Sequence, residues 1–170
     1  MCYARFLLCH RENQGALMTA VEEIRFCSPR DPMAATLVEA LSQVLRNLTG
    51  DDGRSSFSEA DVETPNSAFV VLSRNGEPVA CGALRPLQDD CAEIKRMYSR
   101  LSGGGLVVLR ALERRARELG YREICLSTRK INDRAIAFYR KHGYVIGEPY
   151  GKYRETDLSV CFSKRLQPNS

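Results

Sequence analysis

The feature that most constrains the fold is a strand–helix–strand pattern in residues 91–128. Polar and apolar side chains alternate from Cys91 to Tyr98, which predicts a strand, and Glu123 to Thr128 predicts a second, shorter one. Between them an apolar stripe recurs at helical spacing, at Leu109, Leu112, Ala116 and Leu119. A helix that connects two strands of one sheet implies a parallel crossover. The chain is therefore expected to form an α/β domain.

The other predicted strands are mostly antiparallel. Apolar runs on either side of Asn75-Gly76 predict a hairpin, and a helix is expected to begin after Asp31 and end at Gly50. We expect a single domain over residues 18–170, with a mixed, mostly antiparallel sheet of about seven strands flanked by helices, in which strands four and five are parallel. Residues 1–17 show no clear period, and we interpret them as a flexible, dispensable N-terminal extension or as the result of a misassigned start.

Composition narrows the function classes. The net charge of +4 suits a small anionic ligand better than duplex DNA. Seven cysteines without a CxxC pair indicate reduced thiols in a cytoplasmic protein, and two histidines without a nearby cysteine cluster argue against a metal site. No stretch approaches the roughly 18 apolar residues of a membrane span. We therefore expect a cytoplasmic protein without nucleic acid, membrane or metal as partner.

A glycine run lies between the predicted strand and helix of the crossover. Residues 100–106 read Arg-Leu-Ser-Gly-Gly-Gly-Leu, and such a run exposes backbone N–H groups beside a helix N-terminus, where a diphosphate can bind. The segment is not a Walker loop, because no Gly-Lys-Ser/Thr follows, and Val108 stands where a dinucleotide fingerprint has its last glycine. A flexible turn without a ligand is the alternative.

A second motif follows in residues 132–144, which read Asn-Asp-Arg-Ala-Ile-Ala-Phe-Tyr-Arg-Lys-His-Gly-Tyr. Asn132 and Tyr139 are seven residues apart, so they lie on one helical face, two turns apart. Ile131, Ala135 and Phe138 fall on a neighbouring stripe that we expect in the core. Tyr139 is either a functional residue or a half-buried helix tyrosine.

Over residues 21–166 the two motifs and the order of elements resemble the GNAT family of N-acetyltransferases. The loop matches the family pattern Arg/Gln-x-x-Gly-x-Gly/Ala, and the second motif matches Asn-x-x-Ala-x-x-Phe-Tyr-x-x-x-Gly-Phe/Tyr. The resemblance implies the GNAT fold, with splayed strands four and five, and acetyl-CoA as co-substrate. It implies that Tyr139 protonates the departing thiolate. The cofactor-binding residues that it implies are Met97, Tyr98, Arg100, Gly103, Gly104, Gly105, Leu106, Asn132 and Tyr139.

The sequence departs from the family pattern between Tyr98 and Arg100. This link is shorter than the family's usual connection and lacks its proline. The departure bears most on contacts from Met97 and Tyr98 to the pantetheine arm. It also keeps open an alternative function, a non-catalytic acyl-CoA-binding sensor or structural module of the same fold.

Glu93 is the candidate general base. An amine acceptor is mostly protonated at neutral pH and must lose a proton before it attacks. The local Ala-Glu-Ile pattern is similar to that of some histone acetyltransferases of the family, on the strand that carries their base. Strand alternation predicts Glu93 on the same face as Met97, opposite Ile94 and Tyr98. An exposed strand glutamate, with water chains as the base, is the alternative.

The loops at residues 51–66 and 147–156 are expected to flank the acceptor. Tyr150 and Tyr153 are candidate substrate-binding residues there, although aromatic residues in a loop also serve ordinary packing. The acceptor is expected to be a primary amine of a small molecule or a peptide, attacking the thioester directly. A homodimer, which is common in the family, is compatible with the sequence.

Overall fold

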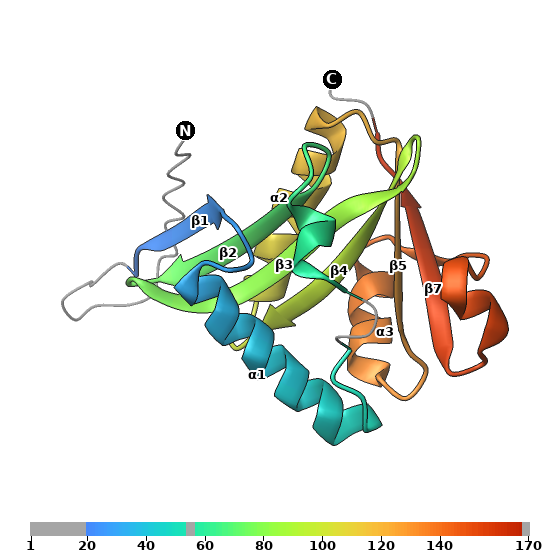
Figure 1. The fold of residues 1–170 in the computed structure, drawn as a ribbon, viewed down its shortest axis with the longest axis horizontal. Coiled ribbons are helices and arrows are strands. Elements are labelled where there is room, and N and C mark those ends of the chain that lie inside the picture. The colour runs from blue at the N-terminus through green and yellow to red at the C-terminus, as the bar shows by residue number, and fades with distance from the viewer. Residues whose placement is uncertain (1–19, 54–56, 168–170) are drawn as a thin grey trace.

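The structure is a computed structural model that describes residues 20–53 and 57–167, so the predicted extension at 1–17 lies outside the described residues. Seven strands form one sheet in the order β1-β2-β3-β4-β5-β7-β6 (Figure 1). β4 and β5 are parallel, and every other pair of neighbouring strands in this sheet is antiparallel, as predicted. The strands are β1 (Glu22–Phe26), β2 (Ala68–Arg74), β3 (Glu77–Gln88), β4 (Cys91–Ser99), β5 (Glu123–Arg129), β6 (Val145–Ile146) and β7 (Ser159–Arg165).

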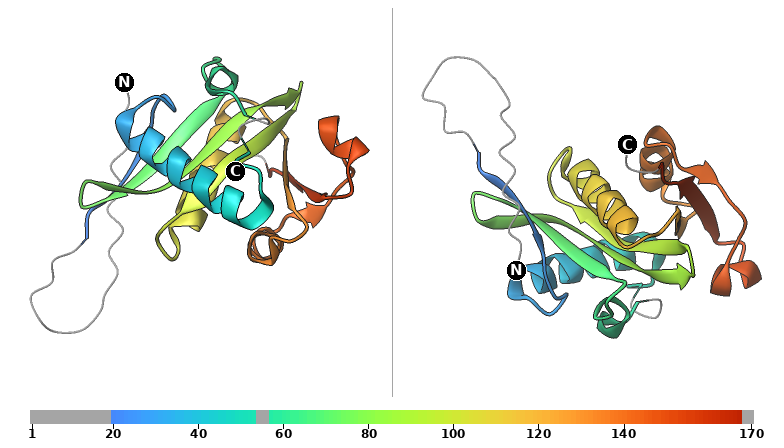
Figure 2. Two further views of the ribbon diagram at one scale, coloured as in Figure 1. Left: turned by 60° about the horizontal axis from the view of Figure 1, so that its bottom comes forward. Right: turned by 90° about the horizontal axis from the view of Figure 1, so that it is seen from above.

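Helices cover both faces of the sheet. α1 (Pro32–Thr49) lies on one face and α2 (Gly104–Glu118) on the other (Figure 2). α3 (Asp133–Lys141) packs against the core on the α2 side through its half-buried apolar residues. Two short 3₁₀ helices, η2 (Glu59–Val62) and η3 (Gly151–Glu155), lie in the two loops that were predicted to flank the acceptor. The described helices contain no segment long and apolar enough to cross a bilayer.

The predicted start and end of α1 are confirmed. The Asp31 side chain accepts a hydrogen bond from the Met33 amide at 3.0 Å, which caps the helix start, and Pro32 is the first helical residue. Gly50 ends the helix with φ 74°, in the left-handed region that glycine adopts without strain. Leu37 and Leu41 of this helix are buried, whereas Val44 and Leu48 are exposed.

β4 and β5 separate as they approach the glycine loop. Their parallel pairing runs from Cys91 and Glu123 and ends at Ile94 and Leu126. Both strands continue further, β4 to Ser99 and β5 to Arg129. The backbone of these last residues therefore has no partner across the β4–β5 boundary, which is the splay that the family resemblance implied.

A β-bulge interrupts β4 and corrects the predicted alternation. Cys81 pairs with Tyr98 but Ala83 pairs with Lys95, so β4 has one residue more than β3 in this interval, and Arg96 has φ 53°. Met97 consequently packs on the same side as Ile94, against α2, whereas Tyr98 packs on the α1 side. The prediction that Glu93 and Met97 share a face was wrong, because simple alternation has no place for the extra residue.

A second correction concerns Ile131. It was expected in the core, but it is 60% exposed, because it lies in the turn before the cap of α3 rather than on the helix. Ala135 and Phe138 do pack against the core, as predicted.

Candidate active site

The glycine loop forms the start of α2. Gly103 is the N-cap with φ 81°, a conformation that favours glycine, and a side chain on the buried Gly104 would place its Cβ 2.7 Å from Ser99 Oγ. Within the described part of the chain, the N–H groups of Gly103 and Gly105 have no hydrogen-bond acceptor. Arg100 is exposed at the beginning of this loop. Free N–H donors at a helix N-terminus suit an anionic ligand such as a diphosphate.

The two sequence motifs meet in space. A Cβ on Gly105 would lie 3.7 Å from the ring of Phe138, so α3 packs directly beside the glycine loop. The Asn132 side-chain oxygen accepts from the Ala135 amide at 3.1 Å and caps α3, which leaves the NH₂ group of that side chain as the part able to contact a ligand. Leu106 lies in the first turn of α2, where its N–H donates to Gly103.

Tyr139 is buried rather than half-buried, with 7% of its surface exposed. Its ring lies against Phe138, Tyr144 and Phe162, with centroid separations of 5.2, 5.6 and 6.1 Å. Burial raises the pKa of the Tyr139 phenol above its ordinary value, because the charged phenolate would be poorly solvated there. The phenol therefore keeps its proton at neutral pH, as a general acid must.

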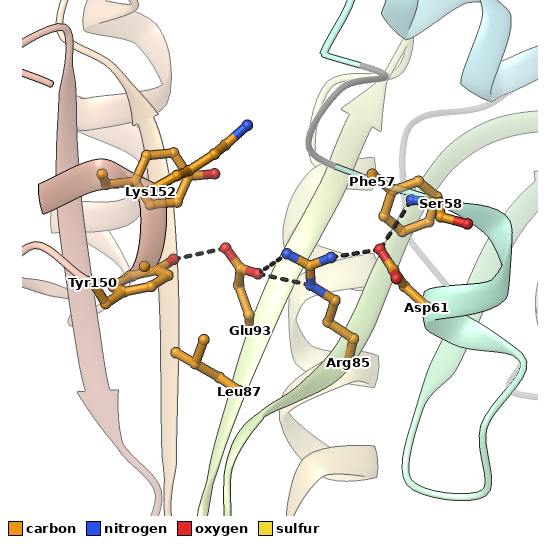
Figure 3. Close-up of a pocket in the computed structure, with 10 residues that line it drawn as sticks. Phe57, Ser58, Asp61, Arg85, Leu87, Glu93, Tyr150 and Lys152 are labelled. Carbon is orange, nitrogen blue, oxygen red and sulfur yellow. Dashed lines mark hydrogen bonds and ion pairs between the residues drawn. The ribbon is translucent and has the colours of Figure 1, made fainter. Parts of the chain in front are cut away.

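On the other side of β4 lies a cavity of about 410 Å³. Its walls come from the η2 loop, from β3 and β4, and from the η3 loop, and Figure 3 shows its side chains. The lining residues are Phe57, Ser58, Asp61, Arg85, Leu87, Glu93, Tyr150, Gly151, Lys152 and Tyr153. The structure thus brings Glu93, Tyr150 and Tyr153, all predicted site residues, to one cavity.

Glu93 is held by two hydrogen bonds and by ion pairs with Arg85 and Lys95. Its Oε2 accepts from Arg85 Nε at 2.8 Å and lies 2.6 Å from Arg85 Nη2. Its Oε1 accepts from the Tyr150 hydroxyl at 2.9 Å (Figure 3). The same oxygen lies 3.5 Å from Lys95 Nζ. The side chain is only 1% exposed, so the alternative of an exposed strand glutamate is wrong. Both carboxylate oxygens of Glu93 are therefore in contact with neighbouring donors.

The two tyrosines of the η3 loop are tied to β4. Burial raises the pKa of the Tyr150 phenol above its ordinary value, and the neighbouring Glu93 carboxylate raises it further. The Tyr153 hydroxyl lies 2.7 Å from Lys95 Nζ, and the two tyrosine rings are in edge contact at 5.3 Å. Glu93 and Lys95 therefore fix the position of the η3 loop above the cavity.

Arg85 and Asp61 are site residues that the sequence did not reveal. Arg85 pairs with Glu93 across β3 and β4 and also donates to Asp61 Oδ2 from its Nη1 atom. Asp61 Oδ2 in turn accepts from the Ser58 amide at 2.9 Å and completes a capping box at η2. One feature could have identified Arg85, namely the antiparallel pairing of β3 with β4, which places Arg85 opposite Glu93.

Two of the remaining predicted site residues lie at the end of β4. Met97 and Tyr98 follow the bulge at Arg96, in the part of β4 that has separated from β5. In residues 20–53 and 57–167 no group of three or more His, Cys, Asp or Glu side chains could hold a metal. The five cysteines described there are free thiols.

Comparison with known proteins agrees with this geometry. A family model described as "Acetyltransferase (GNAT) family" matches residues 34–144. An IAA acetyltransferase from Azospirillum brasilense is 31% identical over 144 residues, which cover 82% of this chain and 94% of the relative. An uncharacterised N-acetyltransferase from Escherichia coli K12 is 28% identical over 141 residues, covering 69% of this chain and 84% of the relative.

Solved structures share the fold. The crystal structure of a Klebsiella pneumoniae protein assigned as an acyl-CoA N-acyltransferase superposes with a TM-score of 0.71 at 27% sequence identity. The match covers 86% of this chain and 98% of that protein. The similarity therefore extends through nearly the whole described domain.

Proposed function

The chain belongs to the GNAT family of acetyltransferases and is an N-acetyltransferase, and from this premise we propose that it transfers an acetyl group from acetyl-CoA directly to a primary amine of a small molecule or peptide. The observation that carries the proposal is the pair of free N–H groups at Gly103 and Gly105, adjacent to the helix that contains Tyr139. A donor site for a diphosphate and a protonated phenol thus lie on packed neighbouring helices.

The residues present fit acetyl-CoA. Arg100 and the two free amides would hold the diphosphate at the start of α2, and Gly104 and Leu106 would complete the turn that presents these amides. The arm would enter between the separated ends of β4 and β5, where Met97, Tyr98 and Asn132 lie. When bound, acetyl-CoA supplies the activated thioester. The bulge at Arg96 lies in the same part of β4, where its extra residue interrupts the regular pairing with β3.

In the proposed reaction a bond forms between the amine nitrogen and the acetyl carbonyl carbon, and the carbon–sulfur bond breaks. Tyr139 donates its proton to the departing thiolate, and the amine loses one proton to a base. Holding both reactants in one geometry and protonating the leaving group are the two contributions of the protein.

Glu93 as that base stays a prediction. Both of its oxygens are already in contact with neighbouring side chains, Oε2 with Arg85 and Oε1 with Tyr150 and Lys95. For Glu93 to take the proton, the incoming amine must displace Tyr150 or Lys95. A pH profile of kcat/KM for Glu93→Gln tests the role, because loss of the base removes the acidic limb of the profile.

The proposed function is tested by incubating the protein with acetyl-CoA and a mixed panel of amines. Free thiol release and the mass of the acetylated products are then followed. We expect amine-dependent release that is lost when Gly103 and Gly105 are both replaced by bulky residues. Acetyl-CoA binding without transfer to any amine would instead support the binding-module alternative.

A further inference from the structure

The cavity beside β4 contains two carboxylates that differ in their free hydrogen-bonding capacity. Glu93 is buried, and both of its oxygens are in contact with donors. Asp61 is 31% exposed at its side chain and uses only Oδ2, for the Ser58 amide and Arg85. Its Oδ1 has no partner among the residues that the structure describes. Among the residues described, Asp61 is therefore the cavity carboxylate that has an oxygen left for a donor from a ligand.

The surroundings hold Asp61 in a fixed position. Arg85 lies between the two carboxylates and contacts both, so Asp61 is anchored to the sheet although it belongs to the η2 loop (Figure 3). The Ser58 amide holds the same oxygen, which directs the rotamer. Lys152 also lines the cavity, where its Nζ lies over the Tyr153 ring at 5.8 Å from the centroid.

The rest of the cavity is suited to an apolar stem. Phe57, which is 8% exposed, lies beside Asp61, and Leu87 lines the floor below Glu93. Tyr150 and Tyr153 form the opposite wall. A ligand that fills this space therefore meets aromatic and aliphatic side chains along its length and one open carboxylate oxygen.

We propose that Asp61 binds the acceptor as an ammonium ion, and that the acceptors are cationic primary amines on an apolar stem. The inference rests on the proposed function and names its substrate class. Asp61 acts as a binding and specificity-determining residue, because its Oδ1 accepts a hydrogen bond from the ammonium group. An acceptor that bears a carboxylate near its amine is disfavoured, because it would face Asp61 with a like charge.

The test compares two amines of the same shape. Phenethylamine is cationic near neutral pH, whereas O-benzylhydroxylamine replaces one methylene by oxygen and is uncharged. The variant is Asp61→Asn, which keeps an oxygen for Ser58 and Arg85. Glu59→Gln serves as the matched control, because Glu59 belongs to the same short helix but pairs with Arg30 outside the cavity.

We expect Asp61→Asn to raise the KM for phenethylamine about 10- to 100-fold, the range for one charge-assisted hydrogen bond. The KM for acetyl-CoA and for O-benzylhydroxylamine should stay at the wild-type values, and Glu59→Gln should change none of them. If Asp61 were only structural, Asp61→Asn would raise the KM for both amines equally. That result would overturn the inference.

Failure of the inference can be told apart from failure of the proposed function. Calorimetric titration of wild type and Asp61→Asn with phenethylamine, in the presence of CoA, measures binding without turnover. Binding that depends on Asp61 but leads to no acetylation would overturn the proposed function and retain the inference. If Asp61→Asn changes neither acetylation nor binding, the inference is overturned and the proposed function is retained.

Discussion

Replacement of Glu93 by glutamine is the single substitution that most directly perturbs the contacts around the cavity beside β4. The change keeps the shape of the side chain but removes the charge that faces Arg85 at 2.6 and 2.8 Å and Lys95 at 3.5 Å. It leaves two buried or half-buried cations without their shared anion. Glu93 also accepts from Tyr150, so the variant weakens the attachment of the η3 loop. Through Arg85, which contacts Asp61, it also weakens the attachment of the η2 loop.

The expected loss follows from the burial of the pair. Breaking a buried ion pair by removing one partner costs about 3–5 kcal/mol. Arg85 is 25% exposed at its side chain and keeps Asp61 as a partner, which reduces the cost to about 2–3 kcal/mol. For a domain of this size each kcal/mol lowers Tm by about 2–4 °C, so we expect a decrease of about 4–12 °C.

A double-mutant cycle in urea provides the assay. The free energy of unfolding is measured for Glu93→Gln, for Arg85→Met and for the double variant, and the coupling between the two sites should be about 1–3 kcal/mol. Glu77→Gln is the control, since Glu77 is an exposed glutamate on β3. If Glu93→Gln stays within about 0.5 kcal/mol of wild type, as an ordinary surface substitution does, the account of Glu93 as an anchor is refuted.

Three further outcomes are expected. Tyr139→Phe should lower kcat about 100-fold or more with little change in acetyl-CoA affinity, measured by steady-state kinetics and calorimetry, and equal turnover would remove its assigned role. Gly104→Ala, whose Cβ would meet Ser99 Oγ at 2.7 Å, should lower both Tm and acetyl-CoA affinity, whereas Ser102→Ala on the exposed loop should lower neither. Burial raises the pKa of Tyr139 and Tyr150, so each should keep its proton at about pH 10, where ordinary tyrosines ionise. Tyr150→Phe should therefore leave the phenolate absorbance at that pH unchanged. A decrease equal to one phenolate would contradict this expectation.

Local signals allowed most of the fold to be predicted from the sequence. The cap at Asp31, the turn at Asn75-Gly76 and the glycine at the start of α2 each act within a few residues, and all three lie where the sequence placed them. The parallel pair also follows from local patterns, because a helix between two strands leaves few other topologies. The glycine loop and α3 were also predicted, because their sequence motifs are local.

The acceptor side depends on contacts that no local pattern specifies. The bulge at Arg96 adds one residue to β4, and only the pairing with β3 reveals it. Arg85 meets Asp61 across 24 residues and Glu93 meets Tyr150 across 57, so these partners follow from the assembled sheet and loops. The sequence identified Glu93 and Tyr150 separately, whereas their hydrogen bond is a property of the tertiary structure.

The central claim is that the glycine loop binds the diphosphate of acetyl-CoA, and calorimetric titration of matched charge variants tests it most directly. Ser102 is exposed in the loop, so Ser102→Gln and Ser102→Glu add similar bulk and differ only in charge. We predict that wild type binds acetyl-CoA with micromolar affinity, and that the glutamate variant binds about tenfold more weakly than the glutamine variant, because its carboxylate repels the diphosphate. No binding by wild type, or equal affinity of the two variants, would contradict the account.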